Sequence, residues 1–278
     1  MRKDGRRVKT IQPMYQVAAH IMARRSDSMN MTEVDIELEP IQKYLNEKRK
    51  EGVSISHLGV VLAAFLRTLC DFPYLNRFVV NKTIYARSEV AIGMVVLKPG
   101  EHEGTMNKMY FDRGMTIFDV QKTIDRYIEE NRAKGDTNST DDLIRKLLAV
   151  PGLCRLGVNL FKWMDKHGLL PKGVIDASPF HCTMTVTNLA SIRTNYIYHH
   201  VYDFGTTTML MAMGNARETP VRKKGEIEFI RTMPIGIVMD ERICNGSQYA
   251  LAFRRFNQLL RNPKELENPP ETVLDDIP

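Results

Sequence analysis

The stretch Pro234-Ile-Gly-Ile-Val-Met-Asp-Glu-Arg-Ile-Cys-Asn-Gly246 has the pattern of a strand, a turn and the start of a helix. Its first six residues are almost all apolar, which is typical of a buried strand. The charged triplet Asp240-Glu241-Arg242 ends the strand pattern. A helical pattern then covers about Ser247–Leu260, and Asn262-Pro263 stops it.

Three further strands are expected just upstream of this stretch. They are Cys182–Asn188, Thr207–Met213 and Glu226–Arg231, with a hairpin connection over Gly214–Gly225 between the last two. Met209, Met211 and Met213 alternate along the second of these strands, so they share one face. We expect that face to belong to the core.

The first half of the chain alternates helix and strand patterns. The spacing predicts a strand through Val34, Ile36 and Leu38, a short helix after Pro40, and a buried helix from about Leu58 to Leu69 capped by Ser54 or Ser56. A hairpin over Arg77–Ala86, a central strand Val90–Leu97, a strand Met106–Phe111 and a helix opened by Thr116 and Asp119 follow.

The middle of the chain is expected to be a polar loop and two helices. The loop covers Lys134–Thr140, and the helices are Asp141–Val150 and Leu153–His167. Their apolar side chains would form an insertion packed on the body, a partner surface or a membrane-surface patch, of which we favour the first. The whole pattern predicts one α/β domain, residues 1–278, with a mixed sheet and a helical insertion at about 136–180.

Composition excludes several protein classes. The 278 residues carry a net charge of +6, and 43% are hydrophobic, which is too many for a disordered chain. The longest apolar run, Leu58–Leu66, is too short to span a membrane. The basic start, Arg2 to Lys9, and the acidic tail, Glu265 to Asp276, are interpreted as solvated ends rather than a nucleic-acid arm.

Cysteine and histidine usage gives no sign of a metal site or of secretion. The four cysteines form no CxxC pair, no apolar leader follows the basic start, and a cytoplasmic protein with free, buried thiols is expected. His199 and His200 are adjacent, so on a strand they would point to opposite faces. Phosphate-binding, dinucleotide-binding, nucleophile-elbow and zinc-hydrolase motifs are all absent from the sequence.

Four segments in order resemble the chloramphenicol acetyltransferase and dihydrolipoamide acyltransferase catalytic-domain family. Residues 240–246, DERICNG, resemble its DHRxxDG signature, and residues 185–189, TVTNL, resemble its TISNL strand. Residues 53–78 resemble its buried helix and the segment after it, and residues 86–96 resemble its VNIGVAV strand. The resemblance covers roughly Val34 to Pro263 and weakens across Lys134–Phe180.

This resemblance implies a fold, a reaction and an assembly. The fold is a two-layer sandwich with a mixed sheet, and the reaction transfers an acyl group from acyl-coenzyme A to a small thiol, hydroxyl or amine acceptor. The family works as a trimer with the active site in a channel between subunits. Since the chain starts at the core, a standalone homotrimer is expected, without a lipoyl domain, metal, nucleic acid or membrane span.

The resemblance also implies roles for particular residues. A histidine in the signature acts as general base, and a hydroxyl on the TISNL strand stabilises the oxyanion. The hydroxyl position is Thr187, the histidine position is Glu241, and the position of the signature's second Asp is Asn245. Because a carboxylate has a reference pKa of about 4.3 against about 6.5 for histidine, Glu241 is the weaker base.

Several alternatives remain open from the sequence. His199 or His200 could supply a displaced base, His181 is a weaker candidate, and Glu241 could instead form a salt bridge with Arg242, Arg24 or Arg25. The chain would then be either an acyltransferase with an altered base or a catalytically inactive trimer with a binding or assembly role. A nucleic-acid binder is the least favoured hypothesis.

Overall fold

The computed structural model describes residues 2–97, 104–133, 149 and 152–276. Within them a seven-stranded mixed sheet has the path β2-β10-β8-β7-β5-β6, with β9 paired to β10. The strands β5–β7–β8 are mutually parallel, and the other pairs are antiparallel. Their bounds are β2 Met29–Glu37, β5 Val90–Leu97, β6 Gly104–Phe111, β7 Met184–Asn188, β8 Met209–Met213, β9 Arg217–Lys223 and β10 Glu226–Asp240.

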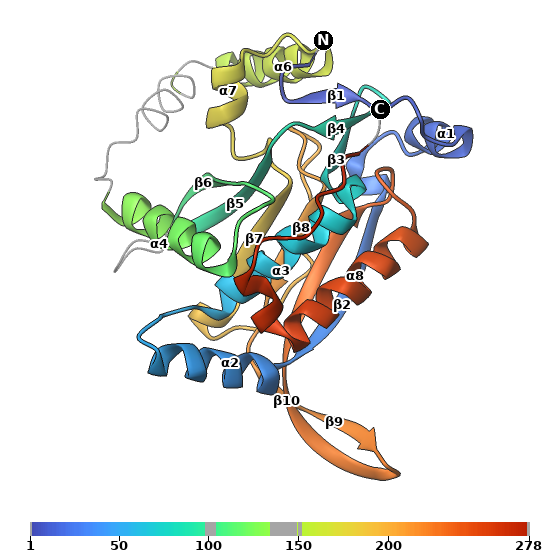
Figure 1. The fold of residues 1–278 in the computed structure, drawn as a ribbon. Coiled ribbons are helices and arrows are strands. Elements are labelled where there is room, and N and C mark those ends of the chain that lie inside the picture. The colour runs from blue at the N-terminus through green and yellow to red at the C-terminus, as the bar shows by residue number, and fades with distance from the viewer. Residues whose placement is uncertain (1, 98–103, 134–148, 150–151, 277–278) are drawn as a thin grey trace.

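Helices form the second layer on one face of this sheet (Figure 1). They are α3 His57–Asp71, α4 Ile117–Ala133 and α8 Gly246–Arg261, while α2 Leu38–Lys50 lies at one end. A smaller sheet, with the order β1-β4-β3, lies at the other end and contains β1 Gly5–Arg7, β3 Arg77–Val80 and β4 Thr83–Arg87. This is the two-layer α/β sandwich with a mixed sheet that the sequence predicts.

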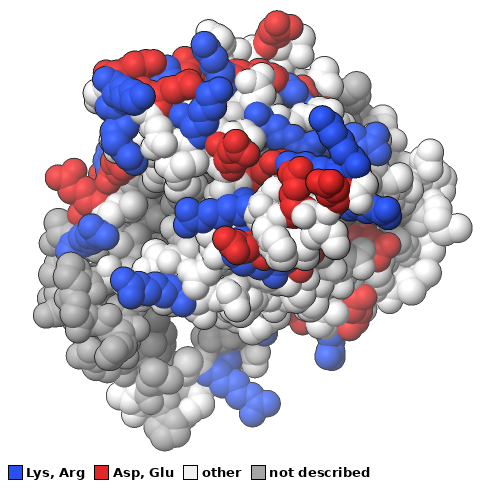
Figure 2. Space-filling model, turned by 90° about the horizontal axis from the view of Figure 1, so that it is seen from below, with Lys and Arg blue, Asp and Glu red and all other residues white. Residues whose placement is uncertain are grey.

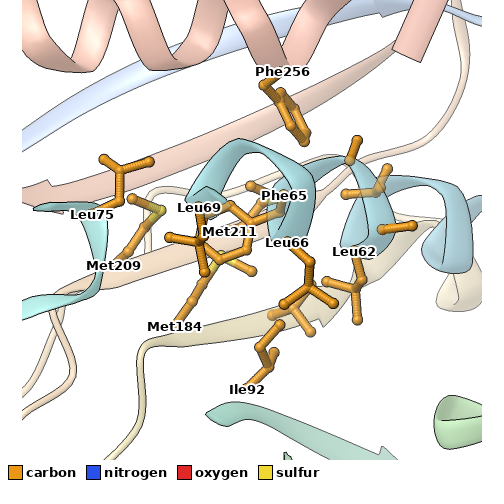
Figure 3. Close-up of a cluster of buried hydrophobic side chains, with 14 of the residues drawn as sticks. Leu62, Phe65, Leu66, Leu69, Leu75, Ile92, Met184, Met209, Met211 and Phe256 are labelled. Atoms are coloured by element: carbon orange, nitrogen blue, oxygen red, sulfur yellow. The ribbon is translucent and has the colours of Figure 1, made fainter. Parts of the chain in front are cut away.

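Helix α3 forms the centre of the core. Ser56 caps it by accepting a hydrogen bond from the Gly59 amide at 3.0 Å. Figure 3 shows Leu62 and Leu66 of α3 above the strands and Phe256 of α8 on the other side of the helix. The methionines of β8 pack here as predicted, with Met209, Met211 and Met213 at most 1% exposed.

The opposite face of the sheet is covered by the loop between β7 and β8, residues 189–208. Val201 in this loop packs with Leu210, Ala212 and Val238 of the sheet. The loop lies so close that a Cβ on Gly236 would stand 2.5 Å from the Tyr196 ring and 2.7 Å from the Ile197 carbonyl oxygen. Glycine is therefore required at position 236 to admit the loop.

Near the C-terminus the predicted strands are confirmed, but the break between two of them and the strand-free connection before them are wrong. Glu226–Arg231 and Pro234–Asp240 form one strand, β10, because β8 pairing begins only at Ile235 and Pro234 therefore needs no amide hydrogen on that side. The expected hairpin connection at Gly214–Gly225 contains the strand β9, which turns into β10 at Lys224-Gly225.

Charged residues near both ends of the described chain are docked on the body. Arg2 is 7% exposed and pairs with Asp4 and Asp165 at 2.8 Å each. In the acidic tail, Asp276 pairs with Arg77 at 2.6 Å. The expectation of solvated ends is wrong for Arg2 and Asp276, because a charge count does not show which opposite charges the fold brings near, whereas the other basic residues of the start are exposed as expected.

The described part of the insertion comprises α6 Leu153–Lys166 and α7 Lys172–Ala177. Figure 1 shows α6 beside β1, far from α2. Its side chains Leu156, Leu160 and Trp163 are 66%, 53% and 53% exposed, so the expectation of apolar packing on the body is wrong for them. The expected loop 134–140 and most of the expected helix 141–150 lie outside the described residues.

Candidate active site

Asp240, at the end of β10, is the centre of a buried charge cluster. Its side chain is fully buried and accepts hydrogen bonds from the Arg242 guanidinium at 2.8 and 2.7 Å and from the Ser28 hydroxyl at 2.9 Å. The Arg25 guanidinium lies 3.7 Å away, and burial lowers the pKa of Arg25. A carboxylate with this many charge-assisted contacts fixes the turn that follows it.

Glu241 is held at the start of that turn by its backbone. Its amide donates to the Ser28 carbonyl oxygen at 2.8 Å, and its side chain is half-buried. The predicted salt bridge between Glu241 and Arg242 or Arg25 is wrong, since both guanidiniums pair with Asp240. No ion pair between described residues includes the Glu241 carboxylate, so it is available for chemistry.

Asn245 begins helix α8. Its side-chain oxygen accepts from the Gln248 amide at 2.8 Å, and the Gln248 side chain accepts from the Asn245 amide at 3.0 Å. This reciprocal pair is a capping box, and the Asn245 amide group also contacts the Tyr15 hydroxyl. Asn245 therefore joins α8 to the N-terminal helix α1, Pro13–Ile21.

Thr187 lies near the end of β7 and lines a cavity of about 240 Å³ on the loop-covered face of the sheet. His199, His200 and Tyr202 of the loop line the same cavity. The His199 and His200 rings stack, with centroids 4.6 Å apart, and His199 Nδ1 lies 2.8 Å from the His200 carbonyl oxygen. The structure therefore brings three of the sequence candidates together.

Glu241 is not part of this cavity. The strand register aligns Thr187 with Ala212 of β8 and Ala212 with Gly236 of β10. Asp240 is four residues further along β10, about 13 Å at the usual rise of a strand, and β10 is two strands away from β7. Within one chain, Thr187 and Glu241 cannot contact the same small reacting group.

A larger cavity has a volume of about 910 Å³. Asn188, the residue after Thr187, lines it, and so do Lys43 and Lys50 of α2, His57 of α3 and Arg231 of β10. The Asn188 side-chain oxygen is buried and has no hydrogen-bond partner among the residues that the structure describes. Burial and the charge of Arg231 lower the pKa of His57.

The larger cavity opens on a face of mixed charge. Figure 2, which views the molecule from the side of α2 and the β9–β10 hairpin, shows Lys and Arg interspersed with Asp and Glu. Glu39 and Glu47 accompany the cations within the cavity itself. An anion would therefore be bound by particular cations rather than by a broad basic field.

His181 is buried and its contacts hold elements of the fold together. It is 3% exposed, its Nδ1 lies 2.8 Å from the Ser178 hydroxyl, and its Nε2 lies 3.3 Å from Asp165. These contacts join α6 and α7 to the start of β7. Its position separates it from the cavity that contains Thr187.

Sequence reasoning missed Asp240, Ser28 and Arg25 as parts of the site. The only local signal was the spacing of Asp240 and Arg242 in the quoted stretch, because Ser28 and Arg25 are more than 200 residues away in the sequence. Among the described residues, there is no group of three or more His, Cys, Asp or Glu side chains suited to a metal ion. The helices described include none long and apolar enough to cross a membrane.

Comparisons with known proteins find the same fold. The sequence model of the 2-oxoacid dehydrogenases acyltransferase catalytic domain matches residues 181–267. A probable dihydrolipoamide acetyltransferase from Listeria monocytogenes superposes with a TM-score of 0.58 at 14% identity, covering 92% of this chain and 94% of its own. A comparison with curated proteins gives no match.

Two further solved structures bear on the site. A dihydrolipoamide acetyltransferase from Azotobacter vinelandii, studied for the roles of one serine, one histidine and one asparagine in its mechanism, has a TM-score of 0.59 at 12% identity, with 93% of each chain covered. A chloramphenicol acetyltransferase has a TM-score of 0.57 at 10% identity, covering 92% of this chain and 99% of its own.

The matched segment, residues 181–267, contains both Thr187 and the Asp240 turn. The surrounding sandwich is shared over nine-tenths of the chain. The resemblance inferred from the sequence is thus confirmed: the chain has the fold of the dihydrolipoamide acyltransferase and chloramphenicol acetyltransferase catalytic domains, and its C-terminal third matches the acyltransferase family model.

Proposed function

We propose that this protein is a coenzyme-A-dependent acyltransferase with an altered catalytic base. The observation that carries the proposal is the position of Thr187 and Asn188, adjacent residues at the end of β7 that each line a different cavity. A hydroxyl at that point can donate to the oxyanion that forms when an acceptor attacks a thioester. The acceptor would be a small thiol, alcohol or amine.

The larger cavity suits coenzyme A. Lys43, Lys50 and Arg231 offer cations to its phosphates, and the unpartnered Asn188 oxygen can accept a hydrogen bond from an amide N–H. Its volume, about 910 Å³, lies within the range of small-molecule sites. When bound, acyl-coenzyme A would supply the thioester, and the chain would supply orientation and oxyanion stabilisation.

The base must come from Glu241 or from the histidine pair. Since Thr187 and Glu241 are far apart in one chain, we propose that Glu241 reaches the Thr187 cavity of another copy, in a homotrimer like that implied by the resemblance. In the Azotobacter enzyme the asparagine follows the histidine by four residues, the spacing of Asn245 after Glu241. That spacing supports the assignment of Glu241 to the histidine position.

A catalytically inactive trimer is the second candidate. It is favoured by one observation, the carboxylate at the histidine position. An inactive trimer would keep the fold and the capped turn at Asn245 but would not accelerate transfer. His199 and His200, which share the cavity with Thr187, are the only other sequence candidates for a base that the described residues place there.

Calorimetry with acetyl-coenzyme A and free coenzyme A tests the proposal first. We expect micromolar binding near one site per chain, weakened about tenfold or more in the double variant Lys43→Ala, Lys50→Ala because two phosphate contacts are lost. A charge-matched control, Lys122→Ala with Lys264→Ala, removes two exposed lysines outside the cavity and should bind normally. Absence of binding at millimolar concentration would refute the proposal.

A further inference from the structure

A separate cavity of about 350 Å³ lies beside the Asp240 turn. Six parts of the chain line it: helix α1, residues 23–25 before β2, the end of β3 with the turn to β4, one side of helix α6, the loop before β8, and the turn after β10. Its charged lining residues are Arg24, Arg25, Lys82, Lys162, Lys166 and Arg242, with Asp165 and Asp203. Six cations thus face two carboxylates.

The two carboxylates are already engaged. Asp165 pairs with Arg2 at 2.8 Å and lies 3.3 Å from His181, and Asp203 accepts from the Arg25 amide at 2.7 Å. Arg25 and Arg242 both pair with Asp240 and share its single negative charge. The ion pairs between described residues include none of Arg24, Lys82, Lys162 and Lys166.

The cavity therefore has an excess of positive charge, and four of its cations have no ion-pair partner among the described residues. Like charges around one cavity repel one another, and the repulsion falls when a multivalent anion occupies the space. The surroundings are also fixed in place. The Arg25 guanidinium donates to the Gly205 carbonyl oxygen at 2.9 Å, and Asn81 and Lys82 both adopt positive φ, as a tight two-residue hairpin requires.

We propose that this cavity binds a small molecule that carries a phosphate or diphosphate group. Exposed lysines and arginines on three different elements can contact such a group at once, and the volume is close to the lower end of small-molecule sites. Two of the lysines come from α6, in the region where the sequence resemblance is weak. The site therefore goes beyond the proposed acyl transfer and does not depend on it.

The only tryptophan of the chain provides the assay. Trp163 lies on α6 next to Lys162 and is 53% exposed, so its fluorescence should respond to a ligand there. The probe is inorganic pyrophosphate, titrated at low ionic strength and followed by fluorescence and calorimetry, with chloride at matched ionic strength as reference. Orthophosphate, titrated in parallel, distinguishes a site for one phosphate group from a site for two.

We expect saturable pyrophosphate binding that is about tenfold or more weaker in the double variant Lys162→Ala, Lys166→Ala. The control Lys122→Ala, Lys264→Ala has the same net charge and should bind as the wild type does. Equal weakening in both double variants would mean general charge screening and overturn the inference. Absence of binding up to about 10 mM would also overturn it.

The two double variants distinguish pyrophosphate binding in this cavity from binding in the larger cavity proposed for coenzyme A. Pyrophosphate binding that survives the Lys43→Ala, Lys50→Ala variant, but is lost with Lys162 and Lys166, supports a second site. The reverse pattern would assign the anion to the larger cavity and refute this inference while leaving the proposed function intact. Coenzyme A binding without pyrophosphate binding would refute it as well.

Discussion

Glu241 occupies the position where the resemblance expects a general base, and the structure leaves its carboxylate unpaired among the described residues. Replacing Glu241 by Gln removes the base but keeps size and polarity. If Glu241 is the base, kcat should fall about 100-fold or more, the usual contribution of general-base catalysis. Release of the free coenzyme A thiol measures turnover, and an unchanged kcat would eliminate Glu241.

A matched variant makes this test more specific. Glu241→His restores the histidine that the resemblance expects, with a reference pKa about two units closer to that of a thiol acceptor. We expect turnover at or above the wild-type value at neutral pH. Since the turn is fixed by Asp240 rather than by the Glu241 side chain, the melting temperature of both variants should stay within about 2 °C of the wild type.

Asn245 stabilises the start of α8 as its N-cap residue. Asn245→Ala removes the capping oxygen and should lower the free energy of unfolding by about 1 kcal/mol, whereas Asn245→Asp keeps an acceptor and should change it by less than about 0.5 kcal/mol. Urea unfolding measures both values. Equal stability of Asn245→Ala and wild type would show that the capping box contributes nothing measurable.

At the scale of elements, helix α6 is attached to the body through buried charges. Arg2 and Asp165 are 7% and 6% exposed, and His181 approaches Asp165 from the other side. Arg2→Ala would leave Asp4 and Asp165 without their shared partner and should cost about 3 kcal/mol of unfolding free energy. Arg7→Ala, in the nearby strand β1 and exposed, is the control and should be neutral.

The same cluster predicts acid sensitivity. Burial raises the pKa of Asp165, but the hydrogen bond from His181 and the charge of Arg2 outweigh it, so the pKa is lowered on balance. A lowered carboxyl pKa means that the folded state binds the proton less well than the unfolded state. The stabilisation is complete above about pH 4 and is lost as the pH falls through the lower, folded-state pKa.

Urea unfolding at several pH values checks this. Between about pH 5 and pH 2 the wild type should lose more stability than Asp165→Asn, which has no carboxyl to titrate. Parallel loss in the two proteins would mean that other carboxylates dominate. Digestion near α6 at low pH reports whether this helix detaches before the body unfolds.

Elements with strong periodicity were predictable, whereas contacts distant in sequence were not. Helix α3, strand β5 and the Asn81-Lys82 hairpin follow from local pattern, because their residues need only their neighbours to define them. β9 was not predicted because its sequence, RETPVRK, is mostly charged and polar and shows no alternation of apolar and polar residues. Arg2 was misjudged because its partner, Asp165, is 163 residues away.

The site shows the same limit. Thr187, Glu241 and Asn245 could be located from motifs, and their segments match the family model. Which of these residues lie close together could not be predicted, because that depends on the register of β7, β8 and β10. Thr187 shares a cavity with His199 and His200, whereas Glu241 is distant from that cavity. A motif gives the positions of residues along the chain, but the pairing of the strands determines which of them lie close together in space.

At the scale of the whole molecule, the distance between Thr187 and Glu241 leads to a prediction about assembly. If each site combines Thr187 of one copy with Glu241 of another, the variants Thr187→Val and Glu241→Gln are each inactive but complementary. In a cyclic trimer that contains both variants, one of the three sites would pair an intact Thr187 with an intact Glu241. Co-expression of the two variants with different tags, followed by purification through both tags, yields such mixtures.

We expect the mixed protein to recover activity on the order of one third of wild type, while either variant alone, purified in the same way, stays inactive. Recovery of this kind requires two copies to share a site, since no single chain in the mixture has both residues. Activity no higher than that of the single variants, in a protein shown to be mixed, would place the reaction within one chain. The base would then have to be sought in the same cavity as Thr187, where His199 and His200 lie.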